Sequence, residues 1–123
     1  MAFLTDRKRA VGMGSARAGT QHHWQMQISS IALLILVPFF VFTFGPMLGE
    51  DHATVVAYFA RPFPALVAAL TLLVGFHHFR QGVQVLIEDY VHGLARRFLI
   101  IAMICVSYGA AATGIFALVR LAL

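Results

Sequence analysis

Three long apolar runs dominate the chain. The first, 28–48, and the third, 98–119, contain no charged residue. The second, 65–90, is apolar as far as Phe76 and increasingly polar beyond it. At about 1.5 Å of rise per residue, a helix through each run can cross a hydrocarbon core of about 30 Å. The pattern therefore predicts an all-α membrane protein with three transmembrane helices.

The segments between the runs contain the residues that end helices. Pro46 and Gly49 follow the first run, and Pro62 and Pro64 precede the second. Pro38, inside the first run, predicts a kink of the kind that neighbouring helices make tolerable in a membrane. The mixed stretch 50–61 is expected to lie along the membrane surface. The expected division of the single domain 1–123 is an N-terminal segment 1–27, helices 28–48, 65–90 and 98–119, and loops 49–64 and 91–97.

Composition agrees with a bilayer as the solvent. Hydrophobic residues make up 60% of the chain and charged residues only 11%, which is too apolar for a water-soluble domain. The net charge is +4, but the basic residues cluster outside the apolar runs. That distribution indicates topology signals and no nucleic-acid partner. The lone cysteine, Cys105, allows neither a disulfide framework nor a thiolate metal site within this chain.

The basic residues also predict the orientation. Most of those near the apolar runs lie before the first helix or between the second and third: Arg7, Lys8, Arg9, Arg17, Arg96 and Arg97. Only Arg61 and Arg120 lie on the other side. Because cytoplasmic loops carry the excess of Lys and Arg, we expect a cytoplasmic N-terminus and a periplasmic C-terminus.

The second run contains a histidine pair at membrane depth. His78 lies near its midpoint, where an ionisable side chain is costly enough to indicate a functional partner such as haem iron, a proton path or a buried hydrogen bond. Gly75 and Gly82 fall on the same helix face and leave space for a flat macrocycle or another backbone. His77 points about 100° away, so the two rings cannot bind one iron from the same side.

Further polar residues follow His78 toward the end of this helix. Asp89 returns to within about 20° of the His78 face, roughly 16 Å nearer the cytoplasmic surface, and Tyr90 is its neighbour. An acid beside a phenol suits hydrogen bonding and proton donation to a carbonyl ligand, as in quinone reduction; simple interfacial anchoring is the alternative. Arg80 lies too deep to be a topology signal alone, and pairing with a carboxylate such as a haem propionate is the sharper interpretation.

These features together resemble a known family, the hydrophobic membrane anchor subunit of bacterial succinate dehydrogenase. The resemblance covers nearly the whole chain, and its most specific part is His78 followed three helical turns later by Asp89-Tyr90. It also includes the basic segment from Asp6 to Ala16 and the sequence His22-His23-Trp24 before the first run.

The resemblance implies a polypeptide that is not catalytic alone, in a multi-pass complex of the bacterial inner membrane. Soluble subunits would oxidise succinate, and electrons would pass through flavin and iron–sulfur clusters to ubiquinone. The implied partners are the flavoprotein subunit, the iron–sulfur subunit, the cytochrome b556 subunit, membrane lipid and ubiquinone. The three helices would then be part of a heteromeric helix bundle.

By position, the resemblance also assigns residues. His78 matches an axial ligand of a b-type haem (haem b) shared with the cytochrome b556 subunit, and His77 is the runner-up. Tyr90 matches the hydrogen-bond donor to ubiquinone, and Asp89 its neighbouring acid. The residues implied near the haem are Arg80, His22, His23 and Gln27. Many relatives have Gln-Arg where this chain has Met26-Gln27, so an arginine near the propionates is absent and Arg80 is the alternative source of charge.

Two other functions fit parts of the pattern. A cytochrome b anchor of a fumarate reductase or another membrane dehydrogenase would use menaquinone in place of ubiquinone. A small proton-coupled carrier would use His78 and Asp89 as a relay, but three spans give no even repeat and the acid lies at the rim of the membrane.

Overall fold

The computed structural model describes residues 5–12 and 19–123. Arg17 and the segment 13–16, both used in the sequence analysis, lie outside the described residues. The helices follow one another in the order α1 (Asp6–Val11), α2 (Gly19–Phe44), η1 (Gly45–Met47), α3 (His52–Phe59), α4 (Pro62–Tyr90) and α5 (Gly93–Ala122). Three helical stretches, Thr20–Met47, Pro62–Tyr90 and Gly93–Ala122, are long and apolar enough to cross a membrane. The all-α, three-helix prediction is confirmed.

The helices extend beyond the apolar runs. α2 begins at Gly19, so His22 and Trp24 lie on the helix itself, and it continues through Pro38 without interruption. α5 starts at Gly93 and ends at Ala122, which leaves only Val91 and His92 between α4 and α5. Gly93 has a φ of +69°, a backbone conformation that glycine adopts without steric cost and that allows this abrupt turn.

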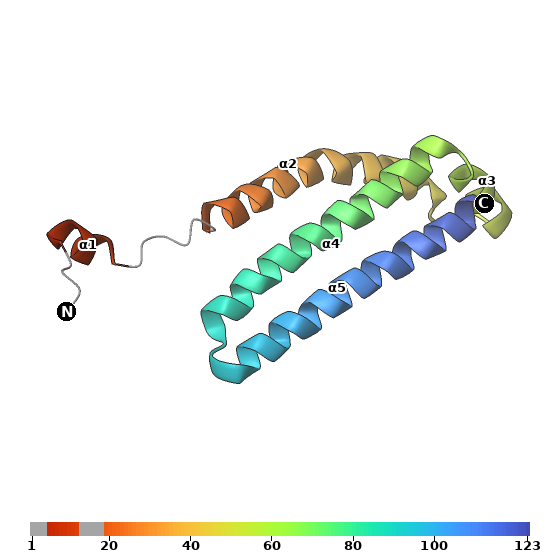
Figure 1. Ribbon diagram of the computed structural model, residues 1–123. Helices are drawn as coiled ribbons and strands as arrows, with labels where there is room; N and C mark the ends of the chain where they lie inside the picture. Colours follow the sequence, from red (N-terminus) through yellow and green to blue (C-terminus); the bar gives the residue numbers. More distant parts are fainter. Residues whose placement is uncertain (1–4, 13–18) are drawn as a thin grey trace.

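The segment after α2, expected to lie along the membrane surface, folds into the short helix α3. Asp51 caps its N-terminus by accepting hydrogen bonds from the N–H groups of Ala53 (3.1 Å) and Thr54 (3.4 Å). Beyond α3, Pro62 occupies the first turn of α4, where its missing N–H costs nothing. α3 therefore closes one end of the bundle, beside the C-terminus of α5 (Figure 1).

α4 is the central helix. Both α2 and α5 pack along it, whereas α2 and α5 make little contact with each other (Figure 1). Where α5 crosses α4, Gly114 faces Leu72 so closely that an added Cβ would lie 3.2 Å from Leu72 Cδ1. The small residue at this position lets the two helix backbones approach.

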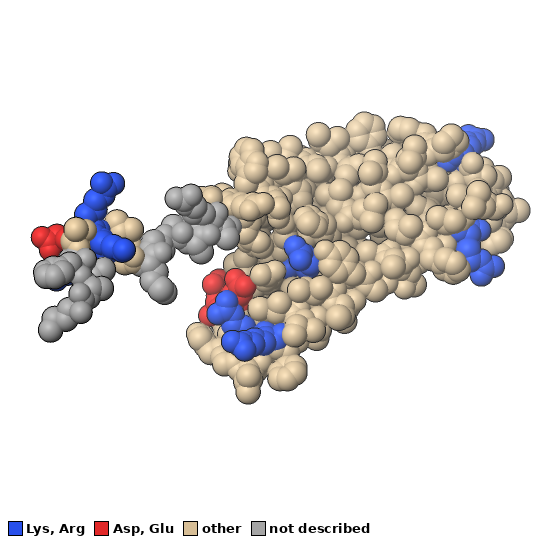
Figure 2. Space-filling view, viewed as in Figure 1, with Lys and Arg blue, Asp and Glu red and all other residues tan. Residues whose placement is uncertain are grey.

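The chain buries little of its own apolar surface. In each span, at most 17% of the apolar window is buried inside the chain, and side chains such as Leu34, Phe42 and Phe116 are largely exposed. Figure 2 shows charged side chains gathered mainly toward the ends of the bundle and on α1, with a broad uncharged band between. This surface requires lipid or other apolar helices around it.

Candidate functional site

The two adjacent histidines of α4 have different surroundings, as their 100° separation predicted. His78 is half-buried toward α2, where its Nδ1 lies 2.9 Å from the Ser29 hydroxyl oxygen. His77 lines a cavity between the helices. Among the hydrogen bonds of the described residues, none engages the Nε2 atom of His78.

A cluster of polar side chains joins α2 to α4 around His78. Ser29 is 5% exposed and Gln81 is fully buried. The Ser29 hydroxyl lies 3.3 Å from Gln81 Oε1 and 2.9 Å from the main-chain oxygen of Met26. Gln81 in turn donates from Nε2 to Gln25 Oε1 at 3.4 Å. These hydrogen bonds satisfy polar groups that would be costly to bury unpaired in a membrane helix pair.

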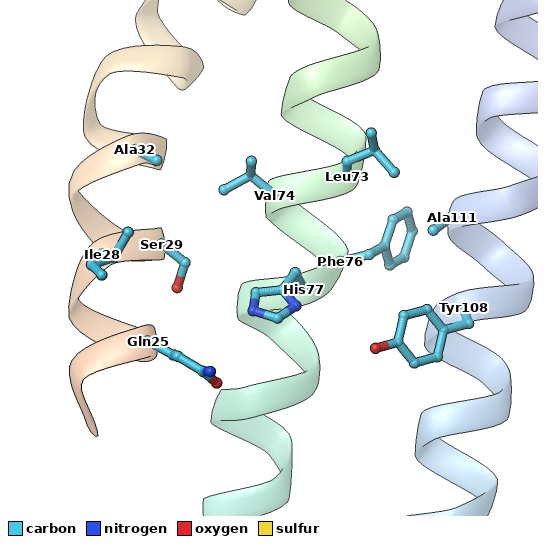
Figure 3. Close-up of a pocket in the computed structure, with 10 residues that line it drawn as sticks. All are labelled: Gln25, Ile28, Ser29, Ala32, Leu73, Val74, Phe76, His77, Tyr108 and Ala111. Atoms are coloured by element: carbon cyan, nitrogen blue, oxygen red, sulfur yellow. The ribbon is translucent and has the colours of Figure 1, made fainter. Parts of the chain in front are cut away.

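Next to this cluster, a cavity of about 540 Å³ opens between α2, α4 and α5. Figure 3 shows His77 from α4 and Tyr108 from α5 facing it, with Gln25 of α2 at its edge. The remaining lining is mostly apolar: Ile28, Ser29, Ala32, Leu73, Val74, Phe76 and Ala111. His77 therefore lines the cavity, whereas His78 is absent from its lining and lies in the hydrogen-bonded cluster, which borders the cavity through Ser29 and Gln25.

Arg80 lies against α5. Its guanidinium carbon is 5.9 Å from the centre of the Tyr108 ring, within the range of a cation–π contact. Its Nε is buried and has no hydrogen-bond partner among the described residues. Residues two positions apart on a helix are separated by about 200° around its axis. Arg80 and His78 therefore leave α4 on nearly opposite sides.

The histidines near the start of α2 also separate. His22 is half-buried, and its Nε2 is buried without a hydrogen-bond partner in the described part of the chain. It is spaced with Gln25 and Ser29 along one side of α2, the side that meets α4. His23 and Gln27 are exposed. Of the pair, His22 is the histidine directed toward α4.

Asp89 and Tyr90 end α4 with exposed side chains, and Tyr90 is 79% exposed. Neither makes a side-chain hydrogen bond to another described residue. Glu88, which the sequence analysis did not single out, accepts a hydrogen bond from Gln84 at 3.1 Å and lies 3.6 Å from Arg96 at the start of α5. Asp89 and Tyr90 thus remain available at the end of the bundle that holds the α4–α5 turn.

The described residues bring few potential metal ligands close together. Among the described residues, no group of three or more His, Cys, Asp or Glu side chains could hold a metal ion. A metal held here would need most of its ligands from a cofactor or another chain.

Comparison with known proteins identifies the family. Residues 2–116 match the model of the succinate dehydrogenase/fumarate reductase transmembrane subunit. The chain is 42% identical to the succinate dehydrogenase hydrophobic membrane anchor subunit of Paracoccus denitrificans, over 100% of this chain and 95% of that protein. This chain belongs to that family.

More distant members of the anchor-subunit family match as well. Identity is 26% to the hydrophobic membrane anchor subunit of Rickettsia conorii, over 83% of each chain. It is 29% to the membrane anchor subunit of Reclinomonas americana, over 72% of this chain and 76% of that protein. No solved structure matches the chain significantly.

Membership confirms the resemblance drawn from the sequence. The chain is a membrane anchor subunit of succinate dehydrogenase, a non-catalytic part of an enzyme complex that works with the other polypeptides of that complex. Its three apolar helices make it a multi-pass protein of the inner membrane. The residues of the site that sequence analysis missed are Ser29, Gln81 and Gln25. The available signal was the presence of polar residues within or just before the first two apolar runs.

Proposed function

We propose that this membrane anchor supplies His78 as one axial ligand of a b-type haem shared with the cytochrome b556 subunit. One observation carries the proposal: the Nδ1 of His78 is already paired within the chain, while its Nε2 has no partner among the described residues. An axial imidazole needs this arrangement, because iron takes one ring nitrogen and a hydrogen-bond partner orients the other.

The face of α4 that carries His78 leaves open space for a flat macrocycle. Gly75 and Gly82 share its face of α4, and a Cβ added at either glycine would meet nothing within 4 Å. A hollow of about 200 Å³ lies over Gly75, between Leu72, Phe76 and Phe79. When bound, the haem would supply a one-electron carrier in the membrane.

Of the residues that the resemblance implies near the haem, His22 is the best placed to meet a propionate. Its buried Nε2 lacks a partner among the described residues, and it lies on the α4 side of α2. Arg80 lies against α5, and His23 and Gln27 are exposed, so we rank them after His22. A histidine in this position would hold the propionate by a hydrogen bond.

Tyr90 and Asp89 are proposed to form part of the site that reduces ubiquinone. The Tyr90 phenol would donate a hydrogen bond to a quinone carbonyl, and the Asp89 carboxyl would assist proton delivery. Both side chains are exposed at the end of α4. Residues that contact another polypeptide must be exposed in this way in the isolated chain. We propose that this end faces the cytoplasm, because Arg96 and Arg97 favour a cytoplasmic position of the α4–α5 turn. The iron–sulfur and flavoprotein subunits would dock there.

A menaquinone-linked fumarate reductase is the second candidate, since the matching family model covers both enzymes. The relatives named above are all succinate dehydrogenase subunits, which favours ubiquinone. Extraction of the quinone that co-purifies with the complex distinguishes the two.

The haem assignment is tested by comparing the adjacent histidines in the intact complex, purified in mild detergent. His78→Ala should abolish the reduced b-type absorbance, whereas the matched control His77→Ala should keep it. An unchanged spectrum in His78→Ala would reject the assignment, and loss in His77→Ala alone would transfer it to His77. If neither variant assembles, His78→Met decides, because a thioether ligand would shift the spectrum only if it replaces an axial histidine.

The quinone assignment needs a second measurement. Tyr90→Phe should lower the rate of ubiquinone reduction by succinate and leave the rate with a soluble artificial acceptor unchanged. Equal loss of both rates would indicate failed assembly in place of a quinone-site role.

A further inference from the structure

We propose that Ser29 is a positioning residue for His78, holding its ring in the tautomer that leaves Nε2 free for iron. The inference rests on the proposed haem ligation and deepens it. Ser29 comes from α2 and His78 from α4, so the contact also ties the ligand to the packing of these two helices.

Few protons are available for hydrogen bonding around Ser29. Its hydroxyl oxygen has three polar neighbours: His78 Nδ1 at 2.9 Å, the Met26 main-chain oxygen at 2.9 Å and Gln81 Oε1 at 3.3 Å. A serine hydroxyl has one proton to donate. Both oxygens are acceptors only, so the protonation of Nδ1 decides how many of these contacts become hydrogen bonds.

The two neutral tautomers of His78 allow different numbers of hydrogen bonds around Ser29. If Nδ1 lacks a proton, it competes with the two oxygens for the single proton of Ser29, and only one hydrogen bond is well made. If Nδ1 carries the proton, it donates to Ser29 Oγ, and Ser29 shares its own proton between the Met26 oxygen and Gln81 Oε1. The protonated Nδ1 adds one hydrogen bond to a buried network, where unmade bonds are expensive.

Gln81 reinforces this direction. It is fully buried, and its Nε2 donates to Gln25 Oε1 at 3.4 Å, so its carbonyl oxygen is the atom turned toward Ser29. Gln81 therefore offers Ser29 an acceptor and no donor. Among these neighbours, the Nδ1–H group of His78 is the only donor whose proton Ser29 Oγ can accept.

The consequence is a histidine prepared for ligation before iron arrives. With the proton on Nδ1, the lone pair of the neutral imidazole is on Nε2, the atom without a partner in the described part of this chain. A hydrogen bond from the far nitrogen fixes both the rotation and the tautomer of a ligating histidine and raises its basicity. Loss of such a partner typically weakens metal binding by about 10- to 100-fold.

The chain provides a matched control in the next residue. The Ser30 hydroxyl also donates to the Met26 oxygen at 2.9 Å, but Ser30 is exposed and makes no hydrogen bond to the described residues of α4. Ser30→Ala therefore removes the same chemical group from the same helix turn without touching His78.

The test uses the intact purified complex with Ser29→Ala and Ser30→Ala. Haem content per flavin and the carbon monoxide difference spectrum of the reduced complex are measured, because carbon monoxide binds only where an axial ligand has loosened. Ser29→Ala should bind carbon monoxide and lose haem to a haem-binding competitor at roughly tenfold lower competitor concentration; Ser30→Ala should match the wild type. Identical behaviour of the two variants would overturn the inference.

A second pair separates hydrogen bonding from packing. Ser29→Thr and Ser29→Val have nearly the same shape, and only threonine keeps the hydroxyl. Ser29→Thr should retain the wild-type haem spectrum and Ser29→Val should not. Equal spectra would overturn the inference even if Ser29→Ala fails to assemble.

The proposed function and the role of Ser29 can fail separately. If His78→Ala keeps its haem, the proposed function itself is wrong. If His78→Ala loses its haem but the Ser29 variants keep the wild-type haem spectrum, only the role of Ser29 is rejected.

Discussion

The two halves of the bundle are joined by different chemistry. In the half where α2 begins and α4 ends, here the histidine half, hydrogen bonds among Ser29, His78 and Gln81 connect α2 with α4. In the half that contains α3, here the α3 half, aromatic rings make the contacts. Phe59 is 3% exposed, and its ring centre lies 6.4 Å from that of Phe44.

The difference follows from what each half has to do. Aromatic and aliphatic packing gives stability but tolerates exchange among groups of similar volume. Buried hydrogen bonds add little stability to helix pairs in a membrane, on average about 0.6 kcal/mol, yet they require one register and one orientation. We infer that the α3 half holds the helices together and the histidine half sets the position of His78.

The largest loss of stability is expected in the α3 half. Phe59→Ala would leave a cavity beside Phe44 and Tyr58 and should cost about 3 kcal/mol. The thermal midpoint of the purified complex measures the loss. Phe63→Ala is the control, because Phe63 is 59% exposed and its removal leaves no closed cavity. Equal midpoints for the two variants would contradict the structural role of Phe59.

The next largest effect is expected where α5 crosses α4. In Gly114→Leu the new side chain would meet Leu72, already 3.2 Å from an ideal Cβ, and overpacking of this kind costs about 1–3 kcal/mol. Gly109→Leu is the matched control in the same helix, since a Cβ there meets nothing within 4 Å. The yield and thermal midpoint of the complex should fall for Gly114→Leu only. A larger fall in yield and thermal midpoint for Gly109→Leu would instead indicate that a helix of another subunit packs over the Gly109 face of α5.

A smaller effect on stability is expected from the histidine half. Gln81→Leu keeps much of the side-chain volume but leaves Ser29 and Gln25 without their shared partner, at a cost of about 1 kcal/mol. Gln84→Leu is the control, because the hydrogen bond of Gln84 runs to Glu88 on its own helix. The haem spectrum should change more than the thermal midpoint. A loss as large as that of Phe59→Ala would remove the distinction between the halves.

The sequence predicted the helices well because each apolar run is long and charge-free over most of its length. Prolines or glycines also separate each run from the next. It also predicted that His77 and His78 point to different sides, since helix geometry alone requires it. The family followed from the order of a few residues, above all His78 and Asp89-Tyr90, and the comparisons confirm it.

The hydrogen-bonded cluster could not be predicted in the same way. In a water-soluble helix, a stripe of apolar residues marks the face that packs inward. α2 is apolar around most of its circumference because lipid covers the outside, so the sequence does not reveal that Ser29 and His22 face α4 while His23 and Gln27 do not. The rotation of one helix against the other decides these contacts, and it depends on the packed structure.

The smallest effect is expected at the cap of α3, the main polar feature of the α3 half. A hydrogen bond from the Thr54 hydroxyl, followed by bonds from the main-chain N–H groups of Thr54 and Ala53, holds the pKa of Asp51 below its ordinary value of 3.8. A lowered folded-state pKa means that the carboxylate stabilises α3 above the ordinary pKa and loses this contribution as the pH falls through the folded value.

Asp51→Ala should therefore lower the thermal midpoint of the complex, but only slightly, because Asp51 is fully exposed and solvent weakens its interactions. The difference from wild type should stay constant between about pH 7 and about pH 5, since Asp51 remains ionised throughout that range. A difference that already narrows there would mean that a group other than Asp51 controls the end of the bundle, and the α3 half would then depend on ionisation as well as on aromatic packing.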